Sequence, residues 1–183
     1  MIKECFERSA YGFRAIMVGF ALLVIGGCSH YYTPDPSRPF EPIDEFTSSA
    51  SITLQNGQPS NTDELFFDPT LNVHSYYANY NKWTDVAIEI AAREMTKRGM
   101  KVGTGAPKWI AMSVVGAHTD VGFIKIETDI TMTVKTSTGY TATYVGRNSS
   151  SMAADIPRQV DGALMRVVRD MLLDPQIVAF LKA

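Results

Sequence analysis

The chain has 183 residues, a formal net charge of -2 and only two cysteines, Cys5 and Cys28. This length suits a single domain of ordinary size, and the balanced charge argues against nucleic acid as a partner, because neutralising phosphates requires clustered lysines and arginines. Any domain that begins after Cys28 contains neither a disulfide nor a thiolate site.

The first 28 residues have the organisation of a secretory signal. Basic residues precede an apolar run from Ala15 to Gly27, and Cys28 follows two small residues. As a helix the run would be roughly 20 Å long, which is shorter than the roughly 30 Å hydrocarbon core that a spanning helix must cross. The pattern is typical of a bacterial lipobox. We therefore expect removal of residues 1–27, with cleavage between Gly27 and Cys28, and a diacylglycerol on the Cys28 sulfur.

The residue after the cysteine predicts the destination. In lipoproteins of two-membrane bacteria an aspartate at this position usually retains the protein at the inner membrane, and here the residue is Ser29. We therefore expect the periplasmic face of the outer membrane, with the membrane itself as a partner through the lipid anchor. A single acyl chain gives only marginal membrane binding, whereas two or more chains, palmitate among them, hold a protein stably on the bilayer.

Residues 28–50 are predicted to be the lipidated cysteine and a proline-rich tether, and residues 51–183 a single periplasmic domain. Prolines at 34, 36, 39 and 42 disfavour a helix, and an extended segment could hold the domain roughly 60 Å from the bilayer. The alternative is that the aromatic residues of this segment, Tyr31, Tyr32, Phe40 and Phe46, pack onto the domain.

Ser51–Gln55 alternates polar and apolar residues and predicts a short strand that ends at Asn56-Gly57. Residues 58–81 are harder to interpret, although 65–67 and 71–73 could each supply a short strand. From about Lys82 to Arg98 the apolar spacing is helical, with Asn81 as a possible N-cap and Gly99 as the stop.

Two charge pairs lie at i,i+4 spacing on this helix, Glu89 with Arg93 and Glu94 with Arg98. Such pairs usually lie on a solvated face, where each contributes a few tenths of a kcal/mol.

Three strands are expected next. Trp109–Ala117 is an apolar, partly β-branched run, a turn is expected at Thr119-Asp120, and residues 124–134 alternate strictly, with Ile124 placed on the apolar face. A turn at 136–139 then leads into a second alternating segment, 140–146, which completes a meander.

Asp155-Ile156-Pro157 predicts the start of a second helix that runs to about Leu172, and Asp174-Pro175 breaks and restarts it before a short apolar tail. The order β-α-β-β-β-α predicts an α+β, two-layer fold with a mostly antiparallel sheet and helices packed on one face.

The sequence contains little that indicates catalysis. His30, His74 and His118 are far apart and lack metal-ligand spacing, so no metal and no cofactor is expected. His118 and Asp120 could in principle serve acid–base chemistry, but an aspartate in a turn explains the pair equally well. Glu127 and Asp129 lie on the same strand face as lysines, and this pattern indicates a solvated face. We expect a protein that is not an enzyme.

Residues 94–103, the strand pair 124–134 and 140–144, and the closing segment 177–181 resemble the YajG-like family of bacterial lipoproteins. The resemblance implies a small α+β periplasmic domain on an outer-membrane lipid anchor. The domain is also similar to auxiliary lipoproteins of ABC-type transporters. Two hypotheses follow. The first is a non-enzymatic envelope lipoprotein that binds a protein partner, and the second is a transport accessory that binds a small or lipid ligand between sheet and helices.

Overall fold

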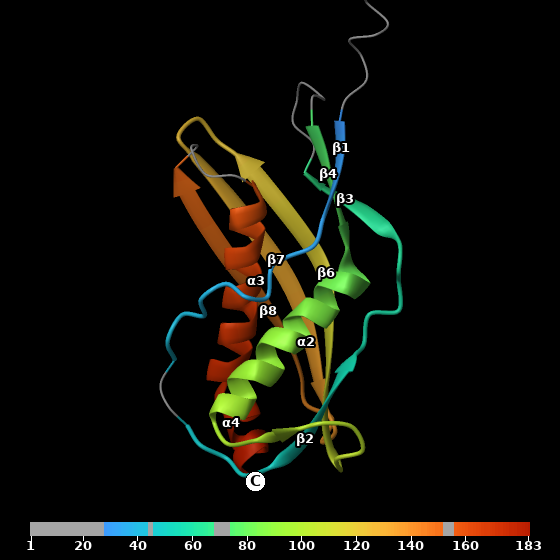
Figure 1. Ribbon diagram of the computed structural model, residues 1–183, viewed down its shortest axis with the longest axis vertical. Helices are drawn as coiled ribbons and strands as arrows, with labels where there is room; N and C mark the ends of the chain where they lie inside the picture. Colours follow the sequence, from blue (N-terminus) through green and yellow to red (C-terminus); the bar gives the residue numbers. More distant parts are fainter. Residues whose placement is uncertain (1–27, 44–45, 68–73, 152–155) are drawn as a thin grey trace, which may run out of the picture.

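The computed structural model describes residues 28–43, 46–67, 74–151 and 156–183 (Figure 1). The predicted signal residues, the 71–73 strand and the predicted N-cap Asp155 lie outside these ranges. The elements in chain order are β1 Cys28–Tyr32, β2 Ser51–Asn56, β3 Asp63–Phe67, β4 His74–Asn79, α2 Tyr80–Lys97, β5 Lys101–Val102, β6 Lys108–Val121, β7 Lys125–Thr136, β8 Thr141–Ser151, α3 Ile156–Leu173 and α4 Pro175–Lys182.

The strands of the described residues form two sheets. The larger has the order β5-β2-β6-β7-β8, in which β2 is parallel to both β5 and β6 while β6, β7 and β8 form an antiparallel meander. The three longest strands are therefore antiparallel, as expected, whereas the short parallel strands β2 and β5 make the sheet mixed.

Strand β7 has the predicted alternation. Ile126, Ile130, Met132 and Val134 are buried against the helices, because successive side chains of a strand point to opposite faces. The predicted position of Ile124 is wrong, since β7 begins one residue later and the Ile124 side chain is exposed.

The preceding turn was also placed too early. Residues 119 and 120 belong to β6, which pairs with β7 as far as Val121, so the hairpin turns at residues 122–124 instead. A bulge between Val114 and Gly116 lets the long strand continue past the point where its apolar run ends.

Helix α2 begins two residues earlier than predicted. The side chain of Asn79, and not of Asn81, accepts a hydrogen bond from the backbone N–H of Lys82 and caps the helix. At the other end Gly99 adopts a positive φ, and Met100 donates back to the Met95 carbonyl, so the predicted stop is confirmed.

Helices α2 and α3 lie on one face of the larger sheet, with α3 over β7 and β8 and α2 over β6 (Figure 1). The close contact of α3 with β8 depends on Gly146, because a Cβ atom there would lie 2.2 Å from the Ala163 carbonyl oxygen. Asp174 caps α4 and Pro175 is its first residue, which confirms the predicted break.

The smaller sheet was not predicted as a unit. It has the order β1-β4-β3, with β1 parallel to β4 and β3 antiparallel to it. Residues 65–67 do lie in β3. The sequence pattern did not predict that residues 28–32 pair with residues 74–79, which lie more than forty positions later in the chain.

The segment expected to be a tether lies against the domain wherever it is described. After β1 it crosses α3 on its outer side (Figure 1), and Ile43 and Phe46 are buried in the core cluster. The expected spacer of roughly 60 Å is therefore not the observed arrangement. The alternative, packing of the aromatic residues onto the domain, holds for Phe46, which is buried, and for Tyr32 and Phe40, which are half-buried against the core, but not for Tyr31, which is exposed. Burial of apolar side chains is favourable.

The architecture is α+β, with a mixed sheet, two helices packed on it and the N-terminal segment outside the helices. No helix among the described residues is long and apolar enough to cross a membrane.

Candidate functional site

Cys28 is exposed, carries a free thiol in the structure and is the first residue of β1. It pairs in register with His74 of β4, so the residue proposed for lipidation is fixed to the smaller sheet with no intervening linker. Gly27, on the other side of the predicted cleavage site, lies outside the described residues.

Two of the three histidines meet, although the sequence separates them by 44 positions. His30 Nε2 and His74 Nδ1 lie 2.9 Å apart on the neighbouring strands β1 and β4, and the His30 ring stacks on Tyr76. Among the described residues, no group of three His, Cys, Asp or Glu side chains could hold a metal ion.

His118 and Asp120 also meet, with Nε2 and Oδ1 3.1 Å apart. Their side chains are 71% and 76% exposed on the sheet face away from the helices, where solvent screens them. Asp129 lies opposite His118 and forms a two-bond ion pair with Arg147, which lowers the pKa of Asp129. The expected solvated face is confirmed, and the exposed His118–Asp120 pair on it is open to water.

The N-terminal segment is joined to α3 at one buried carboxylate, Asp161. It accepts hydrogen bonds from the Tyr32 hydroxyl, from the backbone N–H of Asp35 and from Arg38 Nε. Burial, together with this neighbouring carboxylate, raises the pKa of Tyr32 well above its ordinary value, so the hydroxyl stays protonated and donates. We call these four residues the Asp161 clasp.

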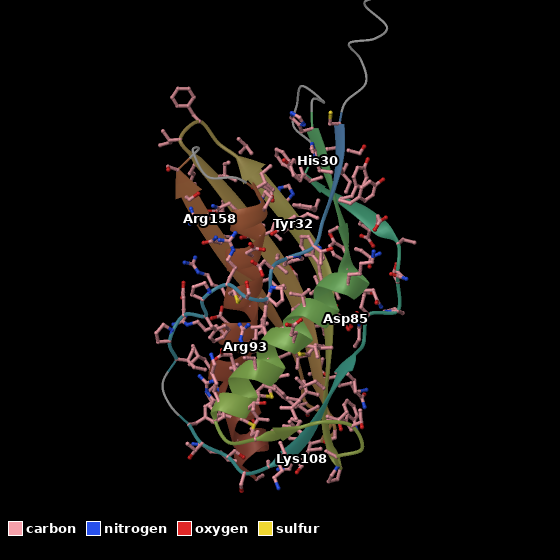
Figure 2. The ribbon with its side chains drawn as sticks, viewed as in Figure 1. His30, Tyr32, Asp85, Arg93, Lys108 and Arg158 are labelled. Carbon is pink, nitrogen blue, oxygen red and sulfur yellow. The ribbon has the colours of Figure 1, made fainter. Side chains whose placement is uncertain are left out.

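Helix α2 holds the same segment at two further points. Trp83 Nε1 donates to the Tyr32 carbonyl at 2.8 Å, and Arg93 donates to the Pro36 carbonyl. Figure 2 labels Tyr32 and Arg93, which lie along the course of this segment. The segment after Cys28 is therefore part of the folded domain.

An open groove of about 650 Å³ lies between the N-terminal segment, α3 and β8, and we call it the arginine groove. Arg38, Arg158 and Arg166 line it, and Figure 2 labels Arg158 beside α3. Gln159 is buried there, and its Oε1 has no hydrogen-bond partner among the described residues, while its Nε2 donates to Ser150. Arg38 pairs there with Asp161 and Arg166 with Glu41, and both carboxylates also line the groove.

A second hollow, of about 1080 Å³, lies at the other end of the long axis near the C-terminus, and we call it the basic cleft. Lys97, Arg98, Lys108 and Lys182 line it, and Figure 2 labels Lys108 at this end.

Two of these four cations are partly neutralised by Glu94. Its carboxylate accepts from Lys97 at 2.8 Å and from Arg98 at 3.1 Å. Burial of Glu94 opposes its ionisation, but these two cations outweigh burial and lower the pKa of Glu94. The prediction of a solvated Glu94–Arg98 pair is wrong, because Glu94 is buried.

Sequence reasoning missed the residues that build these sites. Asp161 lies within a helix of regular apolar spacing, and Arg38 follows four residues after the first proline of the presumed tether, so neither stands out locally. The one available signal was the aromatic content of residues 31–46, which is unusual for a solvated spacer.

No family model and no curated protein matches the sequence. Among solved structures, the chain is similar to the crystal structure of protein XCC0632 from Xanthomonas campestris, described under the family model DUF330. The two chains are 12% identical, with a TM-score of 0.44 over 85% of this chain and 95% of that chain. Similarity at this level supports no functional argument, and the resemblance to the YajG-like family stays a prediction.

Proposed function

We propose that this chain is a non-enzymatic lipoprotein of the bacterial cell envelope, anchored through Cys28 in the periplasmic face of the outer membrane, whose domain binds another envelope protein. The observation that carries the proposal is the sequence around Cys28, a short apolar run ending in two glycines and a cysteine, together with the exposure of that cysteine.

The anchor is tested by replacing Cys28 with serine. Serine cannot form the thioether, so we expect Cys28→Ser to lose incorporation of labelled palmitate, to retain the signal segment and to leave the outer-membrane fraction. Ser29→Ala, one position further, serves as the control and should be labelled like the wild type. Palmitate label retained on Cys28→Ser would overturn the anchor.

The basic cleft is the surface we propose for the protein partner. It lies at the end of the molecule away from Cys28, so an anchored domain would present it to the periplasm (Figure 1). Because Glu94 partly neutralises Lys97 and Arg98, Lys108 and Lys182 are the cations that favour an acidic segment on the partner. A photo-crosslinking residue at Lys182 should capture one discrete envelope protein in intact cells, and the same residue at the exposed Lys135 of β7 should not. Identical products from both positions would contradict the cleft as the docking surface.

The second candidate function is an auxiliary lipoprotein of an ABC-type or lipid transport system, and the arginine groove is the observation that favours it. Guanidinium groups suit the phosphate or carboxylate of a small or lipid ligand, which would compete with Asp161 for Arg38 and with Glu41 for Arg166. Native mass spectrometry of the detergent-purified protein should then show a retained anionic ligand that Arg158→Ala loses and Arg169→Ala, on the same helix outside the groove, keeps. Absence of any adduct in the wild type would remove this candidate.

A further inference from the structure

The tip of the β6–β7 hairpin exposes a cluster of apolar side chains, which we call the apolar tip. Phe123 is 95% exposed, Ile124 is 77% exposed and Val121 is 47% exposed. The hairpin closes tightly, with the Gly122 N–H donating to the Lys125 carbonyl at 2.9 Å. Hairpin turns ordinarily carry glycine, asparagine, aspartate or serine, so two large apolar residues at the tip contribute nothing to the turn itself.

The apolar tip does not contribute to the core either. Val121, Phe123 and Ile124 are absent from the buried cluster and from the half-buried residues packed against it, whereas Ile126, the next apolar residue on β7, is buried. Contiguous apolar side chains that project from a molecule mark a surface that is covered in use.

The position of the hairpin indicates what covers it. Figure 1 shows the β6–β7 turn and the start of β1, where Cys28 lies, at the same end of the long axis, with the C-terminus at the other. Since β1 begins at Cys28 and the following segment is held by the Asp161 clasp, no free spacer among the described residues separates this end of the domain from the anchored cysteine.

The chemistry around the tip suits a bilayer surface. On the hairpin itself the nearest charged residues are Asp120 on β6 and Lys125 on β7, and Lys125 pairs with Glu127 at 2.8 Å. Tyr31, three residues after Cys28, is 68% exposed and stacks on Tyr77. Tyrosine rings with one apolar and one polar side are enriched at membrane interfaces.

We propose that the apolar tip inserts into the headgroup region of the bilayer that holds Cys28, as a second membrane contact that fixes the orientation of the domain. This inference rests on the proposed lipid anchor. With attachment at Cys28 and at the hairpin, the long axis of the domain stands away from the membrane, and the basic cleft faces the periplasm.

The test places an environment-sensitive fluorophore on a cysteine introduced at the tip. Because acylation occupies Cys28, a new cysteine in the lipidated protein is its only reactive thiol. Ile124→Cys retains Phe123, and Thr138→Cys, in the exposed turn between β7 and β8 at the opposite end, is the matched control. Both lipidated proteins are reconstituted in vesicles of phosphatidylethanolamine and phosphatidylglycerol that contain a quencher on the acyl chains.

We expect the probe at position 124 to be quenched roughly threefold more strongly than the probe at position 138, since interfacial segments reach about 5–10 Å below the headgroups. Adding Phe123→Glu should abolish the difference. An acylated, vesicle-bound protein with equal quenching at both positions would overturn the hairpin contact and leave the anchor intact. Tip quenching that appears only after a partner protein is added would also overturn it. A protein that carries no acyl mass and does not bind vesicles would overturn the anchor and this inference together.

Discussion

At the scale of single residues, Asp161 determines how the N-terminal segment lies. It is buried, and its three hydrogen-bond donors, on Tyr32, Asp35 and Arg38, all come from positions more than 120 residues earlier. One of these bonds is also an ion pair, at 2.9 Å, to a partly exposed arginine. A buried carboxylate in such a position stabilises the fold through charged hydrogen bonds, which are stronger than neutral ones.

Asp161→Ala should lower the free energy of unfolding by about 2–4 kcal/mol, because it removes three hydrogen bonds and leaves their donors without an acceptor. Asp170→Ala, on the solvated side of the same helix, should change stability by no more than about 0.5 kcal/mol. Urea unfolding of the soluble domain from residue 29 onward measures both. Equal midpoints for the two variants would show that the clasp does not hold the segment.

A second carboxylate, Asp174, joins the sheet to α4. Its Oδ2 accepts from the hydroxyls of Tyr140 and Tyr144, and its Oδ1 caps the helix at Gln176. Partial burial of Asp174 opposes ionisation, but the two hydroxyls and the backbone N–H groups outweigh burial, so the pKa of Asp174 lies below its ordinary value.

A carboxyl group whose pKa is lower in the folded state stabilises the fold above its ordinary pKa, and that contribution disappears as the pH falls through the folded value. Tyr144→Phe should therefore be less stable than the wild type by about 1 kcal/mol at neutral pH, with the difference shrinking between about pH 5 and pH 2. Tyr31→Phe, at an exposed tyrosine outside this cluster, should behave like the wild type throughout. The urea midpoints of the three proteins are measured across the pH series. A difference between Tyr144→Phe and the wild type that stays constant with pH would contradict the role of the ionised Asp174.

At the scale of elements, the packing of α3 on β8 has no room for a side chain at Gly146. A Cβ there would lie 2.2 Å from the Ala163 carbonyl oxygen and 2.4 Å from the Val167 nitrogen, both of which are backbone atoms that cannot rotate away. The helix and the strand must separate to admit even a methyl group.

Gly146→Ala should therefore destabilise the protein by about 1–3 kcal/mol through overpacking. Gly116→Ala is the matched control, because that strand glycine has open space around its Cβ position and should be neutral to within about 0.5 kcal/mol. Thermal unfolding followed by circular dichroism distinguishes them. If both substitutions were neutral, the close contact of α3 with β8 would be wrong.

The elements that the sequence predicts are those whose signal is local. The apolar spacing of α2, the alternation of β7 and the break at Asp174-Pro175 each lie within one segment, and each is confirmed. Strand β1 could not be predicted, because its partner β4 lies 46 residues away and its first residue was assigned to a tether. The end of β6 was misplaced because Thr119 and Asp120 look like turn residues, whereas the apolar residues at 123 and 124, which form the actual turn, look like strand.

The sites were less predictable than the fold for the same physical reason. Cys28 could be proposed as a lipidation site because the signal pattern that precedes it is contiguous, and lipidation of Cys28 stays a prediction. The Asp161 clasp and the arginine groove each combine residues from the first quarter of the chain with residues of α3, and no pattern within either segment indicates that they meet.

At the scale of the whole molecule, residues 28–43 and 46–50 form an outer layer on the helices and do not serve as a spacer. Ile43 and Phe46 are buried in the common core, and Ser48 bonds both to the Arg98 carbonyl at the end of α2 and to the Leu181 carbonyl of α4. If Cys28 carries the proposed anchor, the anchored residue and the domain would move as one body, and the apolar tip and the basic cleft would keep their positions relative to Cys28.

A protein that begins at Ser51 should be less stable than one that begins at Ser29 by about 3–6 kcal/mol, since it loses the burial of two large apolar side chains. The full domain with Pro39→Ala, at an exposed position of the segment, is the control and should stay close to wild type. Urea unfolding compares the three. Equal stability of the two lengths would restore the interpretation of the segment as a free tether.

The central claim is that the mature protein begins at an acylated Cys28. The most direct measurement is tandem mass spectrometry of the N-terminal peptide from the protein isolated in the outer-membrane fraction. The account predicts a peptide that starts at Cys28 and carries a diacylglycerol on its sulfur. A mature peptide that extends before residue 28, or one that begins at Cys28 with an unmodified thiol, would contradict it.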